Sequence, residues 1–109
     1  MTTSSLPVVI IGAGPAGLAA AAHLRARDIT PLVLETGASA GAGIERWRHV
    51  RMFSPWKFNV DKAAVAILER HGWVMPEGDA FPTGGELVDH YLAPLAGTSE
   101  LAPSIRFNS

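Results

Sequence analysis

The sequence of 109 residues contains no cysteine. This absence excludes a disulfide framework, a thiolate zinc site and a redox-active or nucleophilic cysteine. The chain also lacks an excess of charge of either sign, because 9 Lys and Arg residues against 10 Asp and Glu residues give a formal net charge of −1. It therefore offers no basic field for nucleic acid or anionic lipid, and any ligand must be held by a local site.

Long uninterrupted hydrophobic runs are missing as well. The longest apolar stretch, residues 6–22, is broken by prolines and glycines, whereas a membrane-spanning helix needs about 20 apolar residues without such breaks. The first residues are polar and carry no basic segment, so they do not predict a signal peptide. We expect residues 1–5 to form a disordered tail and the protein to be soluble and cytoplasmic.

The sequence carries no pattern typical of a metal site or of a catalytic residue. The 4 histidines are too widely spaced to form a ligand cluster, and none follows another at the i, i+4 spacing (His23, His49, His71 and His90). No serine lies in a G-x-S-x-G context, so a hydrolase is not supported. We therefore predict no metal ligand and no acid, base or nucleophile among these residues.

Residues 8–35 instead have the pattern of a strand, a helix and a second strand. The run Val-Val-Ile-Ile at 8–11 is typical of a strand buried on both faces in a parallel sheet. Pro15 suits the first turn of a helix, which we expect to extend to about Arg27. Residues 31–35 predict the second strand, reached by a right-handed crossover. The predicted fold class is α/β, with a Rossmann-like parallel sheet.

The remaining residues predict a helical insertion followed by a third strand. Asp61 is a suitable N-cap for a helix that stops at Gly72. Thr83 and Glu86 form a capping-box pattern before a second helix, which Pro94 should end or kink. Residues 104–109 predict the third strand. Four residues are expected to seat the last helix on the core (Phe81, Leu87, Tyr91 and Leu95).

Three glycines form the pattern G-x-G-x-x-G between the first strand and the helix. Gly12 would permit a tight turn, Gly14 would let a pyrophosphate approach the backbone, and Gly17 would let helix and strand pack closely. Glu35 ends the second strand and lies where an acid would bind ribose hydroxyls. FAD and NAD both use this unit. Its place at the start of the chain favours FAD, and the charge of Glu35 disfavours the 2′-phosphate of NADP.

Five segments together resemble the start of flavin-containing monooxygenase-like enzymes, which bind FAD and a second dinucleotide. They are VVIIGAGPAGLAAAAHL, LVLE, ERW, FPTGGELVDHYL and IRFNS. The resemblance implies that the FAD pyrophosphate lies on Gly12, Gly14, Pro15, Ala16 and Gly17, and that Glu35 binds the adenosine ribose. It also implies that a glycine-rich loop lies over the flavin side of the cofactor, with Gly43, Arg46 and Trp47 as the nearest matches. NAD(P)H would be the co-substrate of such an enzyme.

Enzymes of that kind are several times longer and carry a second glycine-rich fingerprint for NADPH. Residues 6–109 therefore predict the N-terminal portion of an FAD/NAD(P)-binding domain, truncated and inactive alone, with an exposed sheet edge prone to self-association. Two alternatives stay open: a non-catalytic nucleotide-binding module or remnant, and an NAD-binding regulatory domain. The role of loop 41–58 is also open, since its aromatics suit either cofactor stacking or packing (Trp47, Phe53, Trp56 and Phe58).

Overall fold

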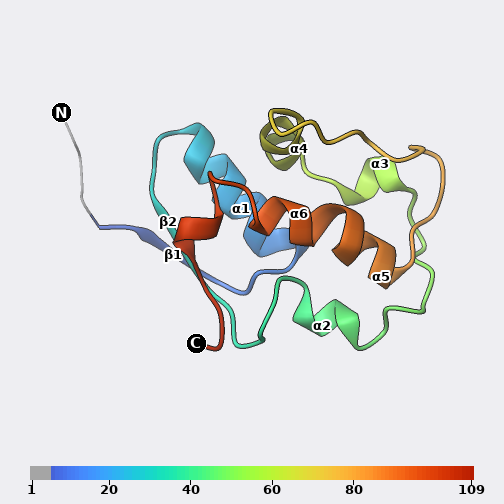
Figure 1. Ribbon diagram of the computed structural model, residues 1–109, viewed down its shortest axis with the longest axis horizontal. Helices are drawn as coiled ribbons and strands as arrows, with labels where there is room; N and C mark the ends of the chain where they lie inside the picture. Colours follow the sequence, from blue (N-terminus) through green and yellow to red (C-terminus); the bar gives the residue numbers. More distant parts are fainter. Residues whose placement is uncertain (1–5) are drawn as a thin grey trace.

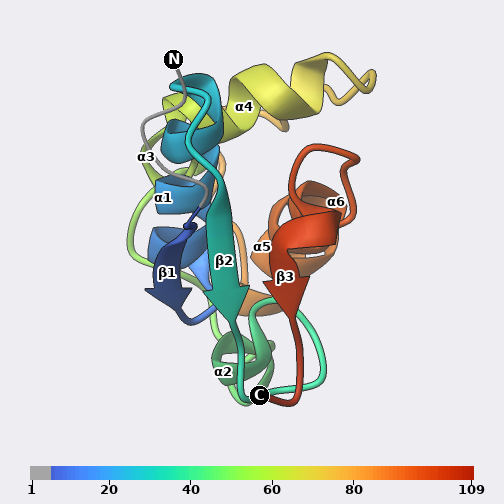
Figure 2. The same cartoon turned by 90° about the vertical axis from the view of Figure 1, so that its left-hand side faces the viewer.

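The computed structural model describes residues 6–109, and the tail expected at residues 1–5 lies outside the described residues. Three parallel strands form the sheet in the order β1-β2-β3, with β1 at Val8–Ile11, β2 at Pro31–Leu34 and β3 at Ile105–Arg106. All helices lie to one side of the sheet or beyond its end (Figure 1), and Figure 2 looks onto the side that they leave bare. The predicted α/β class with a Rossmann-like parallel sheet is confirmed.

Helix α1, Pro15–Ala26, joins β1 to β2 as the sequence predicts. Pro15 occupies the first turn, where its missing N–H leaves no hydrogen bond unmade. The face of α1 that packs against the sheet is formed by small and aliphatic residues, Leu18, Ala21 and Ala22, all fully buried. These short side chains bring the helix axis close to the strands.

The residues between β2 and β3 form a helical insertion, as predicted. Its helices are α2 (Ala42–Glu45), α3 (Trp56–Asn59), α4 (Lys62–Glu69), α5 (Gly84–Leu87), a π-helical turn (Val88–Leu92) and α6 (Ala93–Ala96), followed by a 3-10 turn (Ala102–Ser104). Asp61 caps α4 by accepting a hydrogen bond from the backbone N–H of Ala64. The predicted capping box of Thr83 and Glu86 is present at α5.

Of the two predicted effects of Pro94, ending the last helix is wrong, because the chain continues helically to Ala96. Proline cannot donate to the carbonyl four residues earlier, which belongs to His90. The turn before Pro94 widens to π-helical geometry, and the indole Nε1 of Trp73 donates to the His90 carbonyl at 2.6 Å. A side chain from another segment thus replaces the hydrogen bond that proline cannot make.

The core lies between the covered face of the sheet and helices α1, α4 and α6. Leu87, Tyr91 and Leu95 are buried there, as expected for the seat of the last helix. Phe81 is 43% exposed, so its predicted place in the core is wrong. It precedes the helix, in a surface segment whose backbone binds the side chain of Arg51. Burial raises the pKa of Tyr91, whose hydroxyl accepts the N–H of Asp61 at 2.9 Å.

Strand β1 is not buried on both faces, contrary to the prediction. Within residues 6–109 it pairs only with β2, and its residues Val9 and Ile11 are 53% and 77% exposed. The register places Val9 beside Leu32 and Ile11 beside Leu34, on the face opposite the buried Val33. Among the described residues no helix covers this aliphatic face, as Figure 2 shows. No helix among residues 6–109 is long and apolar enough to cross a membrane.

Candidate nucleotide-binding site

The site begins where β1 ends, in the glycine turn of residues 12–14. Gly12 has φ of +100°, a conformation that residues with a Cβ rarely adopt. Its N–H donates to the carbonyl of Leu34 at 2.8 Å, which ties the turn to the end of β2. A Cβ at Gly12 or Gly14 would meet no atom within 4 Å. The outer surface of the turn is therefore open to a ligand that approaches the backbone.

Gly17 stands in the same motif but in different surroundings. A Cβ there would lie 1.9 Å from the carbonyl oxygen of Gly12. Gly17 is thus required for the close approach of α1 to the turn, the task that the sequence indicated for it. The first bond of the helix runs from the N–H of Leu18 to the carbonyl of Gly14 at 3.0 Å. The preceding N–H groups, those of Ala16 and Gly17, carry the partial positive charge of the helix N-terminus.

Glu35 lies beside this turn, directly after β2. Its Oε1 accepts the backbone N–H of Ala13 and its Oε2 accepts that of Gly37, both at 2.7 Å. These two bonds fix the carboxylate next to the glycine turn. A carboxylate has about four acceptor positions, so capacity remains for hydroxyl donors from a ligand. The structure therefore brings together the predicted pyrophosphate and ribose residues.

The glycine-rich loop approaches the same turn through its backbone. The N–H of Gly41 donates to the carbonyl of Ala13 at 3.0 Å, and Gly41 has φ of +72°. Two residues further, Gly43 is exposed, and a Cβ there would meet no atom within 4 Å. Arg46 is exposed at the end of α2, while the half-buried Trp47 lies against α5. Of the predicted flavin-side residues, Gly43 and Arg46 are thus exposed after the residue that bonds to the turn, and Trp47 is partly engaged by packing.

Sequence reasoning missed three backbone groups of this site: the N–H groups of Ala13, Gly37 and Gly41. Gly37 is sterically required, because a Cβ there would lie 2.4 Å from the Cβ of Ala42 and 3.0 Å from Oε2 of Glu35. A glycine two residues after the acid was the signal available for Gly37. The bond from Gly41 to Ala13 joins residues distant in sequence and had no such signal.

The other aromatic residues of loop 41–58 differ in burial. Trp56 is 5% exposed and belongs to the hydrophobic core, so it does not stack on a cofactor. Phe53 and Phe58 are 100% and 73% exposed. The loop thus combines a core anchor with aromatic side chains that lie on the surface.

Two histidines, His23 and His71, each pair with an acid of the helical insertion. His23 lies 2.9 Å from Asp61, and His71 lies 2.7 Å from Glu100. Mainly the hydrogen bond with His71 lowers the pKa of Glu100 to about 2. Among residues 6–109 no group of acids and histidines is arranged to hold a metal ion.

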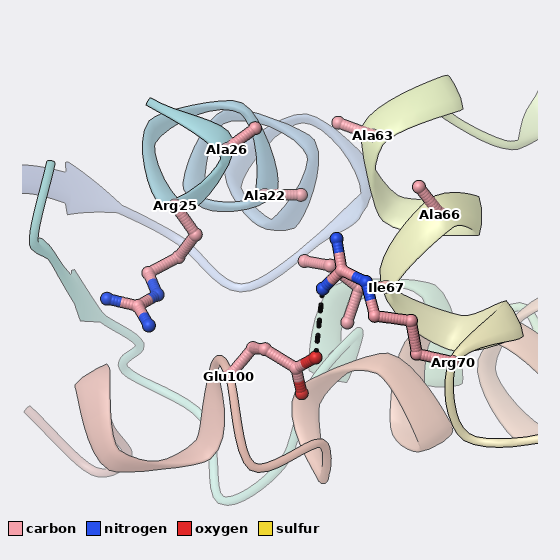
Figure 3. Close-up of a pocket in the computed structure, with 8 residues that line it drawn as sticks. All are labelled: Ala22, Arg25, Ala26, Ala63, Ala66, Ile67, Arg70 and Glu100. Carbon is pink, nitrogen blue, oxygen red and sulfur yellow. Dashed lines mark hydrogen bonds and ion pairs between the residues drawn. The ribbon is translucent and has the colours of Figure 1, made fainter. Parts of the chain in front are cut away.

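A small pocket lies between α1 and α4, at the opposite end of α1 from the glycine turn (Figure 3). Alanines from both helices line it, together with the ion pair in which Arg70 donates to Glu100 at 3.1 Å. Glu100 also pairs with His71, so the one acid that lines this pocket is already engaged by two cationic or polar partners. The glycine turn therefore remains the candidate site.

A parallel sheet with a glycine turn at a helix N-terminus, and an acid after the second strand, defines a Rossmann-type dinucleotide-binding domain. The chain belongs to the pyridine nucleotide-disulphide oxidoreductase family, whose sequence profile matches residues 9–101. Since the chain has no cysteine, it contains no redox disulfide of its own. No curated protein sequence matches the chain significantly.

Solved structures of two proteins are similar over nearly the whole chain. An oxidized steroid monooxygenase bound to NADP is 27% identical, with a TM-score of 0.69, over 93% of this chain and 19% of that chain. OTEMO in complex with FAD and NADP is 23% identical, with a TM-score of 0.70, over 98% of this chain and 20% of that chain. The chain thus spans about a fifth of the length of these proteins. The family match and the similarity to the steroid monooxygenase confirm the resemblance to the start of a monooxygenase-like FAD oxidoreductase.

Proposed function

We propose that the chain is the FAD-binding part, residues 6–109, of an NAD(P)H-dependent flavoprotein oxidoreductase of monooxygenase type. The observation that carries the proposal is the open glycine turn at the N-terminus of α1, with the carboxylate of Glu35 fixed beside it. The steroid monooxygenase and OTEMO, whose structures contain NADP or FAD and NADP, support the choice of cofactor.

The residues present fit the adenosine diphosphate half of FAD. The space beside Gly14, which a Cβ would fill, admits a pyrophosphate against the backbone of Gly12, Gly14, Pro15, Ala16 and Gly17. The helix N-terminus supplies donors and partial positive charge to the phosphates, and the spare acceptor positions of Glu35 suit the ribose hydroxyls.

The flavin half of the cofactor would extend toward the loop that carries Gly43, Arg46 and Trp47. The flavin, when bound, accepts hydride from NAD(P)H and reacts with oxygen. The role of residues 6–109 is to bind and orient the flavin and to exclude water from one side of it. The exposed guanidinium of Arg46 makes no ion pair within residues 6–109, so it is available to an anionic or polar group of a ligand.

These 109 residues alone should bind FAD weakly and should not oxidise NAD(P)H. The glycine turn provides contacts for the ADP half, whereas the described residues offer the flavin ring only the loop at 41–47. A ring left largely in water gains little from apolar burial. Weak flavin retention by this chain is therefore part of the proposal.

We also propose that the chain self-associates through β1. In the part of the chain that the structure describes, one edge of this strand is unpaired, and Val9 and Ile11 expose aliphatic surface beside it. Residues 1–22 contain no charged side chain, although charges are the usual protection of an exposed edge. Sedimentation velocity should show a concentration-dependent oligomer that Val9→Lys abolishes, whereas a monomer at all concentrations would refute this.

A cytoplasmic location remains a prediction from the sequence.

Calorimetric titration with ADP and with NAD⁺, together with the absorption spectrum of added FAD, tests the proposed cofactor. We expect ADP to bind and the flavin spectrum to shift on mixing with the protein. Binding of NAD⁺ without any response to FAD would favour the NAD-binding regulatory domain. Binding of ADP with no flavin response would favour the non-catalytic nucleotide-binding module.

A further inference from the structure

Helix α5 begins with two buried glycines whose neighbours are side chains of the cofactor loop. A Cβ at Gly84 would lie 2.7 Å from both Cε3 and Cζ3 of Trp47, and 3.0 Å from Cγ2 of Ile44. Gly84 is helical, so its backbone conformation does not require glycine. Glycine is also a poorer helix former than alanine. The reason for glycine here is therefore the space that Trp47 occupies.

Gly85 has the same relation to the next residue of the loop. A Cβ there would lie 2.8–3.0 Å from the guanidinium of Arg48. That guanidinium donates to Asp89 at 2.6 Å and to Glu45 at 3.2 Å. Arg48 therefore lies flat over the first turn of α5 and connects it to α2.

Backbone hydrogen bonds hold the same two segments in register. The N–H of Gly84 donates to the carbonyl of Val50, and the N–H of Gly85 donates to the carbonyl of Arg48, both at 2.9 Å. The N–H of Met52 donates to the carbonyl of Pro82 at 2.8 Å. The donors that a helix N-terminus usually leaves free are thus taken by the cofactor loop.

We propose that Gly84 and Gly85 are positioning residues: they form a seat that holds Trp47 and Arg48, and thereby the loop at 43–47, in place before the cofactor binds. The seat rests on the proposed function, since it orients residues assigned to the flavin side. A loop ordered in advance loses less conformational entropy on binding, which favours the ligand half that contacts it. The seat should therefore strengthen binding of FAD without affecting that of ADP.

The first test examines the seat without any ligand. The indole ¹H–¹⁵N signal of Trp47, assigned with Trp47→Phe, is compared in the wild type, Gly84→Ala and Gly78→Ala. Gly78 is the matched control, because a Cβ there would lie 3.6 Å from Lys57, an ordinary contact. We expect Gly84→Ala to shift or broaden the Trp47 signal while those of Trp56 and Trp73 persist. Gly85→Ala should shift the Trp47 signal less, since the added methyl group would meet the flexible end of the Arg48 side chain. An unchanged Trp47 signal in Gly84→Ala would overturn the seat.

The second test compares affinities for FAD and ADP. The wild type should bind FAD weakly but about two- to threefold more tightly than ADP, because the loop at 43–47 alone contacts the flavin half. Gly84→Ala should bind both equally, with its ADP affinity unchanged. In Gly84→Ala/Trp47→Leu the smaller side chain relieves the overlap, so stability should recover while the preference for FAD does not. A preference retained by Gly84→Ala would refute the positioning role. Failure of the wild type to bind ADP would refute the proposed function instead, and the indole signal would still decide the seat.

Discussion

The glycine turn at residues 12–14 and the glycine pair at the start of α5 contain the same residue type in opposite surroundings. Beside Gly12 and Gly14 there is open space, whereas beside Gly84 and Gly85 lie the side chains of Trp47 and Arg48. Open space next to a surface glycine marks a place where a ligand can reach the backbone. Occupied space marks packing between segments. Gly17 belongs to the second kind, although it stands in the dinucleotide motif.

The largest effect should come from filling the occupied space at Gly17. Gly17→Ala would press a methyl group against the backbone oxygen of Gly12, and that atom cannot move without displacing the turn. We expect a loss of about 3 kcal/mol or more in the free energy of unfolding. Urea denaturation measures it, with Gly14→Ala as the control that should stay near the wild type. Equal stability of the two variants would contradict the distinction between occupied space at Gly17 and open space at Gly14.

Filling the open space at Gly14 should abolish binding instead of folding. Gly14 has φ of −91°, which a residue with a side chain can adopt, and a Cβ there meets no protein atom. The side chain in Gly14→Val would take the place proposed for the pyrophosphate. We expect no heat of ADP binding by calorimetry and a circular dichroism spectrum like that of the wild type. Full ADP affinity in this variant would show that the turn is structural only.

Glu35→Ala should weaken ADP binding by about 1.5–3 kcal/mol, the typical contribution of a hydrogen bond to a charged group. The same change removes the acceptor for Ala13 and Gly37, so the unfolding free energy should fall as well. Glu69→Ala is the matched control, since Glu69 is exposed on α4. Titration of both variants with ADP separates them. Unchanged affinity in a folded Glu35→Ala protein would remove Glu35 from the site.

The smallest expected effect is on stability at acid pH, through the contact between His71 and Glu100. Because His71 lowers the pKa of Glu100 from 4.5 to about 2, the folded state favours the ionised carboxylate. The resulting stability should be complete above about pH 4.5 and should be lost as the pH falls toward 2. Glu100→Gln should flatten this part of the stability profile in acid denaturation and leave ADP affinity at neutral pH unchanged. A profile identical to the wild type would contradict the assignment.

Local patterns in the sequence were sufficient to predict the strand–helix–strand unit, the Asp61 cap and the capping box at Thr83. Each depends on residues close together in the chain. The π-helical turn could not be predicted in this way, because it depends on Trp73 reaching the carbonyl of His90 from another segment. The exposure of β1 was missed for a similar reason, since a hydrophobic run does not reveal how many neighbours a strand has.

The candidate site was predictable to the same extent. Gly12, Gly14, Gly17 and Glu35 follow from spacing along one unit, and the structure places them together. The seat of Trp47 on Gly84 was not predictable, because the two residues are far apart in sequence and meet only through the insertion. The pattern TGGE predicted a helix cap and gave no reason for its two glycines.

Backbone amide shifts on titration with ADP test the difference between the two glycine regions most directly. If the open turn is the binding site, the ¹H–¹⁵N signals of Gly14, Ala16 and Gly17 should move in a saturable way, while those of Gly84 and Gly85 stay in place. Shifts centred on Gly84 and Gly85, or no saturable shift at the turn, would contradict the account.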